Sequence, residues 1–451
     1  MLARSSGGFL RSVVILVSGT AFSQGISLAL LPILTRLYAV EDFSILAVYT
    51  SLLGILSVIA CARLEIAVPL PQSEEDAFHL LIASLGASVL TAVLLGIAVL
   101  TSADFIAALL KQPDILPYLW LIPMGVWLTS SFAAIQSWAA RRKQFRAIAI
   151  VKVKQALFAG AVQLFFGIFL SPSALGLLLG QVINTGSGAI GLGFRTLREE
   201  WKTLVHGFTL KNLKQQLGTY SKFPKYSIVE SLANSAGTQI PIIIIAAVAL
   251  PEAGFVFLAT RLIAAPMALI GNSTAQVYLS QAADEYRVGN LGPFSLSVVK
   301  GLYRLGSGPL IFAACAAPYV VPLIFGPEWR RAGVVTSWMI GWFIIQFMAN
   351  PISMALHITG HQRFAAVLQL FGFFIRTVIV VCAWKFFPHQ ISEAYAVSGL
   401  IFSVVYLLVT LRIIRISFLD FGIQIIANSK STVIWAVAGI GLIFTMWMFG
   451  I

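Results

Sequence analysis

The chain has 451 residues, of which 59% are hydrophobic and only 10% are charged. Soluble domains have roughly 45–50% apolar and 25% charged residues, so a soluble enzyme of this size is excluded and a membrane protein is indicated. The formal net charge is +13, but the positions of the basic residues, given below, explain it without nucleic acid. The three cysteines, Cys61, Cys315 and Cys382, lie in apolar stretches without the spacing of a disulfide framework or a metal site.

Thirteen apolar runs follow one another along the chain, each close to the ~20 residues that a helix needs to cross a bilayer. The expected fold class is therefore an all-α polytopic membrane protein with 12 core spans and one additional span. The first run is too long for a signal peptide and is expected to stay in the protein. The runs cover residues 13–34, 43–62, 77–100, 117–138, 148–170, 174–194, 228–250, 254–282, 302–325, 333–356, 365–387, 394–413 and 432–451.

The orientation follows from the lysines and arginines, which gather in cytoplasmic segments of membrane proteins. A cytoplasmic N-terminus places 23 of the 30 basic residues in inner segments, seven of them in the long loop 195–227. Only four, Arg36, Lys111, Arg330 and Arg331, then lie in outer loops. The sequence therefore predicts a cytoplasmic N-terminus, and the basic residues serve as topology determinants next to anionic lipid. The longest outer loop is expected at 101–116.

Short matches between the two halves of the chain indicate an internal duplication. The acidic pair before the second span, Glu41 and Asp42, matches Glu252 before the eighth at an offset of 211. Because six spans is an even number, both halves have the same orientation, and we expect two six-helix lobes related by a pseudo-twofold axis along the membrane normal. Such bundles are typical of transporters with the substrate site between the halves. The expected domains are a lobe at 1–200, a cytoplasmic loop at 201–227, a second lobe at 228–413 and a tail at 414–451.

Polar stripes at helical spacing run along the first span and its counterpart, the seventh. Hydrocarbon would leave these groups without partners, so both stripes are expected to line a cavity, with Gln24 and Asn234 at their centres. The stripes are Thr20, Ser23, Gln24 and Ser27 in the first span and Glu230, Asn234 and Thr238 in the seventh.

Three of the basic residues inside spans are candidates for function, because a charge at the centre of a span costs about 2.5–3.5 kcal/mol on insertion scales. Arg376 is the deepest, Arg261 shares a small-residue face of the eighth span with Asn272, and Lys154 lies near the start of the fifth span. One interpretation is a cationic cavity for an anionic substrate. The other is structural pairing with Glu230 or with backbone carbonyls. The first is favoured for the two arginines and the second for Lys154.

Six short motifs lie at characteristic places along the chain. They are TRLY at 35–38, EDF at 41–43, RLEIAVPLP at 63–71, YSKFP at 220–224, Arg261-Leu262 with Pro266 and Gly271 in the eighth span, and FGPEWRRAG at 325–333. Together they resemble the motifs of the polysaccharide-type oligosaccharide flippases of the multidrug/oligosaccharidyl-lipid/polysaccharide (MOP) exporter superfamily. The resemblance covers roughly residues 10–413, and the order and spacing of the motifs are its most specific aspect.

The resemblance implies a flippase in the bacterial inner membrane that carries an undecaprenyl-diphosphate-linked oligosaccharide to the outer leaflet for O-antigen or exopolysaccharide assembly. Its partners would be this polyprenyl-linked substrate, membrane lipids and, as a further candidate, the polysaccharide polymerase machinery, with no nucleic acid, no cofactor and no metal. No P-loop or catalytic triad pattern occurs, so no enzyme is expected. The motifs add Arg36, Arg63 and Glu65 to the candidate substrate-binding residues, which also include Glu230.

Three alternatives stay open. A lipid II flippase of the same superfamily is the nearest, although two further spans would be expected for it. A multidrug exporter of that superfamily would favour acidic residues in the cavity, whereas the deep charges here are mostly Arg. A membrane polymerase or ligase of the same pathway is the remaining alternative, and it would need a larger outer loop than the sixteen residues expected here.

Overall fold

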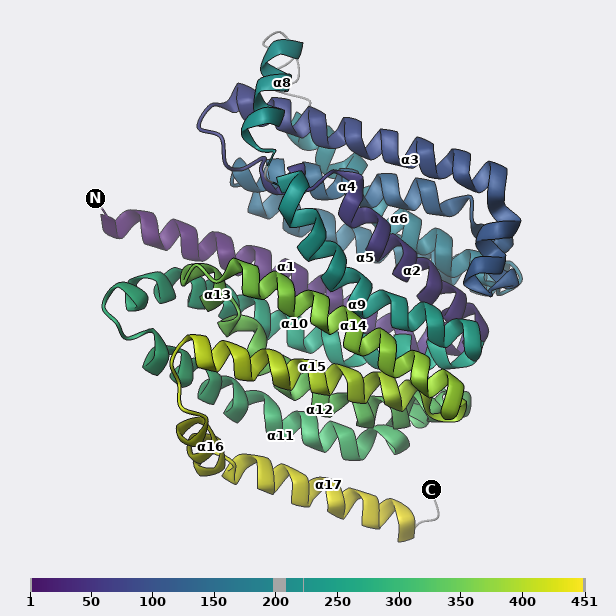
Figure 1. Cartoon of the computed structure of the whole chain (residues 1–451). Coiled ribbons are helices and arrows are strands. Elements are labelled where there is room, and N and C mark those ends of the chain that lie inside the picture. The colour runs from purple at the N-terminus through teal and green to yellow at the C-terminus, as the bar shows by residue number, and fades with distance from the viewer. Residues whose placement is uncertain (1, 198–207, 222, 449–451) are drawn as a thin grey trace. The chain divides into compact units, whose positions relative to one another are not determined.

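The computed structural model describes residues 2–197, 208–221 and 223–448, and every regular element within these ranges is a helix (Figure 1). The helices are α1 (Leu2–Leu37), α2 (Val40–Ala60), α3 (Glu74–Leu110), α4 (Leu121–Arg141), α5 (Phe145–Phe169), α6 (Ala174–Leu197), α8 (Leu210–Thr219), α9 (Ile228–Val248), α10 (Leu250–Arg287), α11 (Leu291–Phe325), α12 (Arg330–Ile352), α13 (Met354–Ile358), α14 (Gln362–Phe386), α15 (Ile391–Ile413), α16 (Phe418–Ala427) and α17 (Lys430–Met448). Short turns are η1 (Leu64–Ile66), η2 (Pro113–Tyr118), η3 (Phe223–Ser227), η4 (Pro327–Trp329) and η5 (Pro388–Gln390). The predicted all-α fold class is confirmed.

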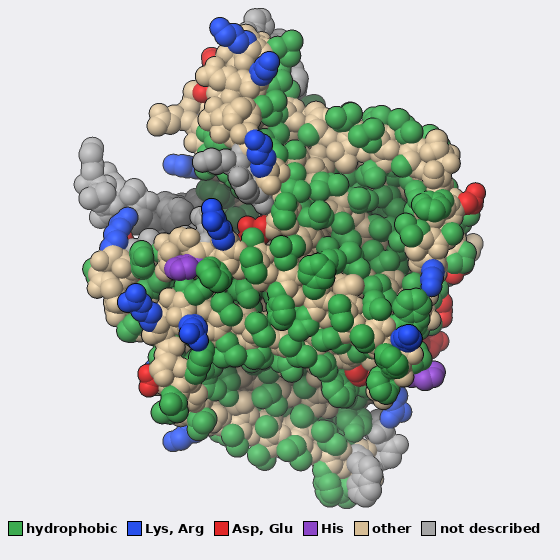
Figure 2. All heavy atoms as spheres, in the orientation of Figure 1, with side chains coloured by type: hydrophobic (Ala, Val, Ile, Leu, Met, Phe, Trp, Pro, Cys, Tyr) green, Lys and Arg blue, Asp and Glu red, His purple; other side chains and the backbone are tan. Residues whose placement is uncertain are grey.

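Eleven of the described helices are long and apolar enough to cross a membrane, and α16 with α17 forms a bent pair that raises the number to twelve. The chain is thus a multi-pass membrane protein. The expected span at 117–138 corresponds to α4, which is not among the eleven because its Gln136 and hydroxyl side chains lower its mean hydropathy. Figure 2 shows hydrophobic side chains along the lengths of the helices and charged side chains mainly near their ends.

The structure corrects the expected outer loop at 101–116. Helix α3 continues to Leu110, with a break in its helical backbone at Ser102 (φ −143°, ψ 30°). Because most of the segment is helical, the connection to α4 consists mainly of Lys111, Gln112 and the short turn η2.

The chain divides into two compact units, Met1–Gln239 and Ile240–Ile451. In the first, α2, α4 and α6 pack against one another, α3 packs against α4, and α5 packs against α6. In the second, α10, α12 and α15 pack against one another, α11 packs against α12, and α14 packs against α15. These five helix pairs thus occur in both units in the same chain order, which supports the predicted duplication, whereas among the described residues the packing of α1 on α5 has no counterpart of similar extent between α9 and α14.

The loop expected at 195–227 contains regular structure. Residues 198–207 and Lys222 lie outside the described residues, but α8 within the loop packs against the start of α3. The backbone N–H of Thr209 donates to Nε2 of buried His79 at 3.1 Å, and the His79 and Phe208 rings stack 5.0 Å apart. Thr209 also caps α8 by accepting a hydrogen bond from the Asn212 N–H at 3.2 Å.

The C-terminal helix α17 packs along α11, which accounts for the described part of the expected thirteenth run at 432–451. The Ser307 and Thr432 hydroxyls lie 2.7 Å apart, and Trp435 meets Phe312 edge to face. The preceding helix α16 is bent by 57° from α17. None of its residues is buried.

Candidate functional site

Arg376 lies in the middle of α14 and is 3% exposed. Its guanidinium carbon lies 4.2 Å from the ring centroid of Phe402 and 5.3 Å from that of Trp342. Tyr395 packs edge to face on Trp342. Among the described residues no carboxylate pairs with Arg376, and its Nε has no hydrogen-bond partner. Aromatic rings of the same unit therefore surround this charge, and cation–π attraction replaces an ion pair.

Two glycines permit this aromatic enclosure. A Cβ at Gly372 would lie 2.4 Å from Phe402, and one at Gly399 would lie 2.3 Å from Trp342. Both distances are far below van der Waals contact, so any larger residue at either position would displace the ring that covers Arg376.

Arg261 lies on α10 and is half-buried, with its guanidinium 5.4 Å from the ring centroid of Phe257. One helical turn further along α10, a cavity of about 320 Å³ opens between α10 and α12. This α10–α12 cavity is lined by Ala264, Met267, Gly271, Ala275, Phe343, Gln346, Phe347 and Asn350. Its first lining residue, Ala264, follows Arg261 by three residues on α10.

Two polar residues of this cavity, Gln346 and Asn350, are absent from the sequence-based candidates. They follow Trp342 at i+4 and i+8 on α12, so a polar stripe along an otherwise apolar span was the signal that could have revealed them. The Gln346 Oε1 and Trp342 Nε1 atoms are buried and have no hydrogen-bond partner among the described residues. Asn272 lies on α10 beside the cavity residue Gly271, but its side chain is outside the described residues.

The polar stripe of α1 faces helix α5 in part. The Ser23 hydroxyl donates to the Lys152 carbonyl at 2.9 Å, and the Lys152 ammonium donates to the Thr20 hydroxyl at 3.5 Å. Gln24 is half-buried. Thr20 and Ser23 therefore find their hydrogen-bond partners on α5. That Gln24 lines a cavity stays a prediction.

The remaining candidates within membrane spans of the first unit are dispersed. Lys154 is exposed on α5, while Lys152, two residues earlier, makes the contact with α1. On α9, Asn234 is exposed and Glu230 is partly buried, and the neighbouring Ser235 donates to the Gly54 carbonyl of α2 at 2.6 Å. No ion pair among the described residues of the first unit includes Lys154 or Glu230.

Arg63 and Glu65 form an ion pair in the loop between α2 and α3, with 3.3 Å between Nη1 and Oε1. Arg63 adopts a left-handed backbone (φ 58°), and Glu65 is 8% exposed. Burial raises the pKa of Glu65, and its second carboxylate oxygen has no partner in the described part of the chain. Arg36, at the end of α1, is exposed. Arg63 and Glu65 therefore pair with each other at a helix connection, with Glu65 buried and Arg63 partly exposed, and their role toward a substrate stays a prediction.

Arg141, assigned to topology by its charge alone, holds the same loop in place. Its guanidinium donates to four backbone carbonyls of the segment that precedes α3, at 2.6 to 3.3 Å. The accepting residues are Pro69, Pro71, Gln72 and Ser73. The motif at 63–71 thus has a structural function at this end of the first unit.

No group of three or more potential metal ligands occurs among the described residues. Chemically, the second unit offers a half-buried guanidinium near a cavity with amide side chains and a second guanidinium enclosed by aromatic rings. Neither guanidinium forms an ion pair with a carboxylate of the described residues. Both positive charges can therefore attract an anion.

Comparisons with known proteins agree with a transport fold. The sequence model of a family described as polysaccharide biosynthesis protein matches residues 33–333. No curated protein sequence matches the chain. The structure of lipid II flippase MurJ in an inward closed conformation is similar with a TM-score of 0.72 at 12% identity, covering 97% of this chain and 99% of that chain.

Two further structures are also similar. A MOP superfamily transporter from Pyrococcus furiosus has a TM-score of 0.58 at 14% identity, with 93% of this chain and 96% of that chain covered. An inward-facing multidrug resistance MATE family transporter has a TM-score of 0.52 at 13% identity, with 92% and 95% covered. At these identities the likeness shows a shared fold alone.

Proposed function

The chain belongs to the polysaccharide biosynthesis protein family, and from this premise we propose that it is a flippase for an undecaprenyl-diphosphate-linked oligosaccharide. It would move this lipid from the cytoplasmic to the outer leaflet of the bacterial inner membrane for O-antigen or exopolysaccharide assembly. The N-terminus would be cytoplasmic. The transfer needs no covalent chemistry, because the substrate leaves chemically unchanged.

One observation carries the proposal: Arg261 is a half-buried cation inside a membrane span with no acidic partner among the described residues. Burying a guanidinium at that depth costs free energy, so its presence in a span indicates a functional role. Its planar fork suits two phosphate oxygens at once, and the amides of Gln346 and Asn350, which line the α10–α12 cavity, can bond sugar hydroxyls. Arg376 adds a second fixed positive charge in the same unit, and Asn272 would extend the polar face of α10.

The physical need for a protein is clear for such a substrate. A diphosphate and several sugars cannot cross hydrocarbon unaided, because each unpaired polar group costs several kcal/mol. The polyprenyl tail could stay in lipid while the headgroup passes through a cationic cavity that opens to one side at a time. Gln24, Asn234, Glu230, Arg36 and Lys154 are proposed to contribute to this path from the first unit.

A second candidate substrate is lipid II. The structural similarity to the lipid II flippase MurJ favours it, since that protein matches over almost the whole of both chains. The family match favours a polysaccharide precursor instead. We place the polysaccharide precursor first because the family match rests on sequence.

Depletion of the protein in its native host separates the two substrates. We expect surface polysaccharide to disappear while its lipid-linked precursor accumulates in the inner membrane, with wild-type protein restoring both and Arg261→Ala restoring neither. Arg330→Ala, which alters an exposed arginine at the start of α12, serves as the matched control and should restore both. Accumulation of lipid II with normal surface polysaccharide would assign the protein to the second substrate.

A further inference from the structure

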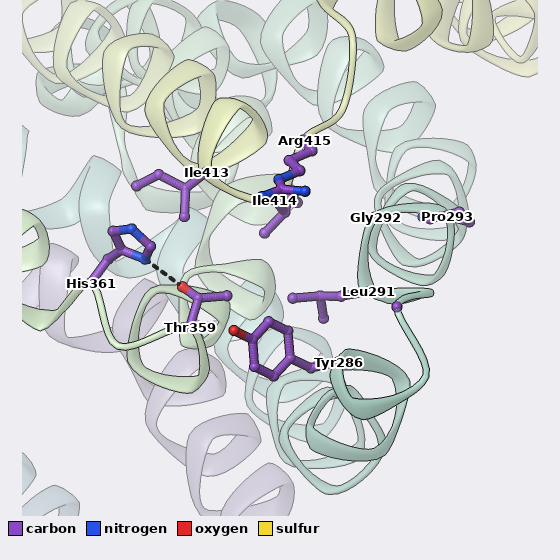
Figure 3. Close-up of a pocket in the computed structure, with 10 residues that line it drawn as sticks. Tyr286, Leu291, Gly292, Pro293, Thr359, His361, Ile413, Ile414 and Arg415 are labelled. Carbon is purple, nitrogen blue, oxygen red and sulfur yellow. Dashed lines mark hydrogen bonds between the residues drawn. The ribbon is translucent and has the colours of Figure 1, made fainter.

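A second cavity, of about 490 Å³, opens at one end of the second unit, where α10 and α15 end and α11 and α14 begin (Figure 3). We call it the Arg415 cavity. Its lining residues are Tyr286, Gly289, Leu291, Gly292, Pro293, Thr359, His361, Ile413, Ile414 and Arg415. Neither Arg261 nor Arg376 belongs to this lining, so the cavity is separate from the proposed transport site.

The polar groups of the Arg415 cavity suit an anion. Arg415 supplies a guanidinium, and His361, Thr359 and Tyr286 supply hydrogen-bonding groups on the facing side (Figure 3). The His361 Nδ1 and Thr359 Oγ1 atoms lie 3.0 Å apart, which orients both side chains. None of the lining residues is acidic.

Two helix starts lie at this cavity beside the ends of α10 and α15, so the helix dipoles oppose one another and the Arg415 guanidinium sets the sign of the potential. Helix α11 begins at Leu291 and α14 begins at Gln362, directly after His361, and the first turn of a helix presents N–H groups without intrahelical partners. The nearest acidic residues along the chain, Asp284 and Glu285, are already engaged. Asp284 accepts from Arg287 at 2.8 Å, and Glu285 accepts from Asn290 at 2.6 Å.

The backbone that shapes the cavity is conformationally unusual. Arg415 adopts a left-handed conformation (φ 61°), and Gly289 has φ 75°. The turn at the end of α15 is closed by hydrogen bonds from the Arg415 and Ile416 amides to Arg412 and Leu411 carbonyls at 3.1 and 2.9 Å. The turn therefore holds Arg415 at the cavity rather than along the helix.

Helix α16, which starts three residues after Arg415, indicates the depth of the cavity in the membrane. It has 10 residues, too few to span a bilayer, and its Phe418, Leu419, Ile423 and Ile426 side chains are exposed. A short helix with exposed apolar side chains beside charged residues is stable in the plane of the membrane surface. Such an orientation of α16 would place Arg415 at the level of the lipid headgroups, where phosphate is the abundant anion.

We infer that the Arg415 cavity binds the phosphate group of an anionic phospholipid from the leaflet on which α16 lies. The Arg415 guanidinium would pair with the headgroup phosphate, His361 and Tyr286 would donate to its oxygens, and the acyl chains would lie along the apolar surface of α16. This lipid is a bound component of the protein and is distinct from the transported substrate.

Native mass spectrometry of the full chain in detergent tests the inference, with dioleoyl phosphatidylglycerol as the probe. We expect one tightly retained phosphatidylglycerol that dioleoyl phosphatidylcholine replaces poorly and that millimolar inorganic phosphate does not displace. Arg415→Asn removes the charge with a residue that tolerates the left-handed backbone, and it should weaken retention about tenfold. Tyr286→Phe, which keeps the ring, should weaken retention severalfold without disturbing the fold.

Two controls separate the site from general charge effects. Lys143→Asn alters another exposed basic residue with a left-handed backbone (φ 56°) in the other unit, and Arg412→Gln alters an exposed arginine of α15 outside the cavity lining. Both should retain the lipid as the wild type does. Equal retention of the two lipids, or unchanged retention in both Arg415→Asn and Tyr286→Phe, would overturn the inference. Displacement by inorganic phosphate would contradict a lipid as the source of the anion.

Discussion

Arg376 shows how a charge can persist inside a membrane span without a carboxylate. Placing an arginine at the centre of a span costs about 2.5–3.5 kcal/mol on insertion scales, and a desolvated cation–π contact returns about 2 kcal/mol. The rings of Phe402 and Trp342 together can therefore offset most of the cost. It follows that Arg376 contributes to the fold even where its charge also serves an anionic substrate.

Arg261 and Arg376 should therefore respond differently to replacement by alanine. We expect Arg261→Ala to reach normal membrane abundance but to abolish surface polysaccharide, because this half-buried side chain has only Phe257 as a described aromatic neighbour. Arg376→Ala should lower both abundance and polysaccharide, since it leaves a void between two large rings. Quantitative immunoblots of membranes beside polysaccharide gels measure both effects. Normal polysaccharide from Arg261→Ala would reject its proposed role.

Glu65 provides a prediction on pH. Burial raises the pKa of Glu65 in the folded protein, so folding favours its protonated form. Stability should then fall as the pH rises from below the unfolded value of about 4.3 to above the raised folded value, and remain lower beyond it. Glu65→Gln removes this dependence. The unfolding temperature of the wild type minus that of Glu65→Gln should therefore decrease with pH across this window, and a constant difference would contradict the assignment.

Among the elements, the first turns of α10, α12 and α15 are joined by one side chain. Arg331 at the start of α12 donates to Glu252 on α10 at 2.9 Å and to Glu393 on α15 at 2.8 Å. Ser392 completes the group by donating to Glu252. These three helices pack against one another, so the group closes one end of their common interface.

Removal of Arg331 should loosen this end of the second unit. Arg331→Leu leaves two carboxylates without their shared cation, and we expect a loss of about 2 kcal/mol, allowing for the 28% exposure of the arginine side chain. Thermal unfolding of the purified variant measures it, with Arg330→Leu as the exposed neighbouring control. Adding Glu393→Gln should recover part of the loss, because it removes one of the two repelling charges. If Arg331→Leu unfolds at the same temperature as Arg330→Leu, the ion-pair group does not stabilise the protein.

Hydropathy predicted most of the helices because membrane spans need long apolar runs, whatever their neighbours. It missed the helical structure beyond Thr101 in α3 and the helix α8, since neither is marked by a new apolar run of span length. Helix α8 gains its place from tertiary contacts, including the hydrogen bond between Thr209 and His79. Contacts between residues 130 positions apart cannot be obtained from local periodicity.

The candidate site was predictable only in part for the same reason. Charge at depth within a span identified Arg261 and Arg376 from the sequence alone. The aromatic enclosure of Arg376 and the cavity beside Gln346 depend on which helices pack together, and no local pattern contains that information. Arg141 was interpreted by charge alone, whereas its position against four carbonyls gives it a structural role.

At the scale of the whole molecule, the distribution of basic residues predicts a cytoplasmic N-terminus, which makes the segment 195–227 cytoplasmic. A cysteine at Gln215, exposed on α8, should then react with an impermeant maleimide only after cells are opened. A cysteine at Gln390, exposed between α14 and α15, should react in intact cells as the matched control. Cys382 is exposed and must be replaced first, whereas Cys61 is buried and shielded from the reagent. Rapid labelling at Gln215 in intact cells would invert the topology.

The charge of the proposed substrate also implies a driving force for the transfer. A headgroup with about two negative charges gains about 4.6 kcal/mol on crossing a 100 mV potential outward from a negative interior, if the cavity stays neutral. Fixed arginines in the cavity offset part of the diphosphate charge, so the gain is smaller when the substrate-loaded cavity turns outward. Their positive charge then favours the inward turn of the empty cavity, because it is drawn toward the negative interior. Glu230, on α9, leaves proton coupling as the alternative.

Transfer of a labelled undecaprenyl-diphosphate oligosaccharide across the bilayer of proteoliposomes tests the proposed function most directly. The vesicles contain the purified protein and an imposed potassium-diffusion potential, with no proton or sodium gradient, and access of a membrane-impermeant glycosidase reports the leaflet. We predict transfer that requires the protein, accelerates with the potential and is lost in Arg261→Ala but retained in Arg330→Ala. Transfer equal to that of empty vesicles would contradict the proposed function, and protein-dependent transfer that ignores the potential but follows an ion gradient would contradict the electrical driving force.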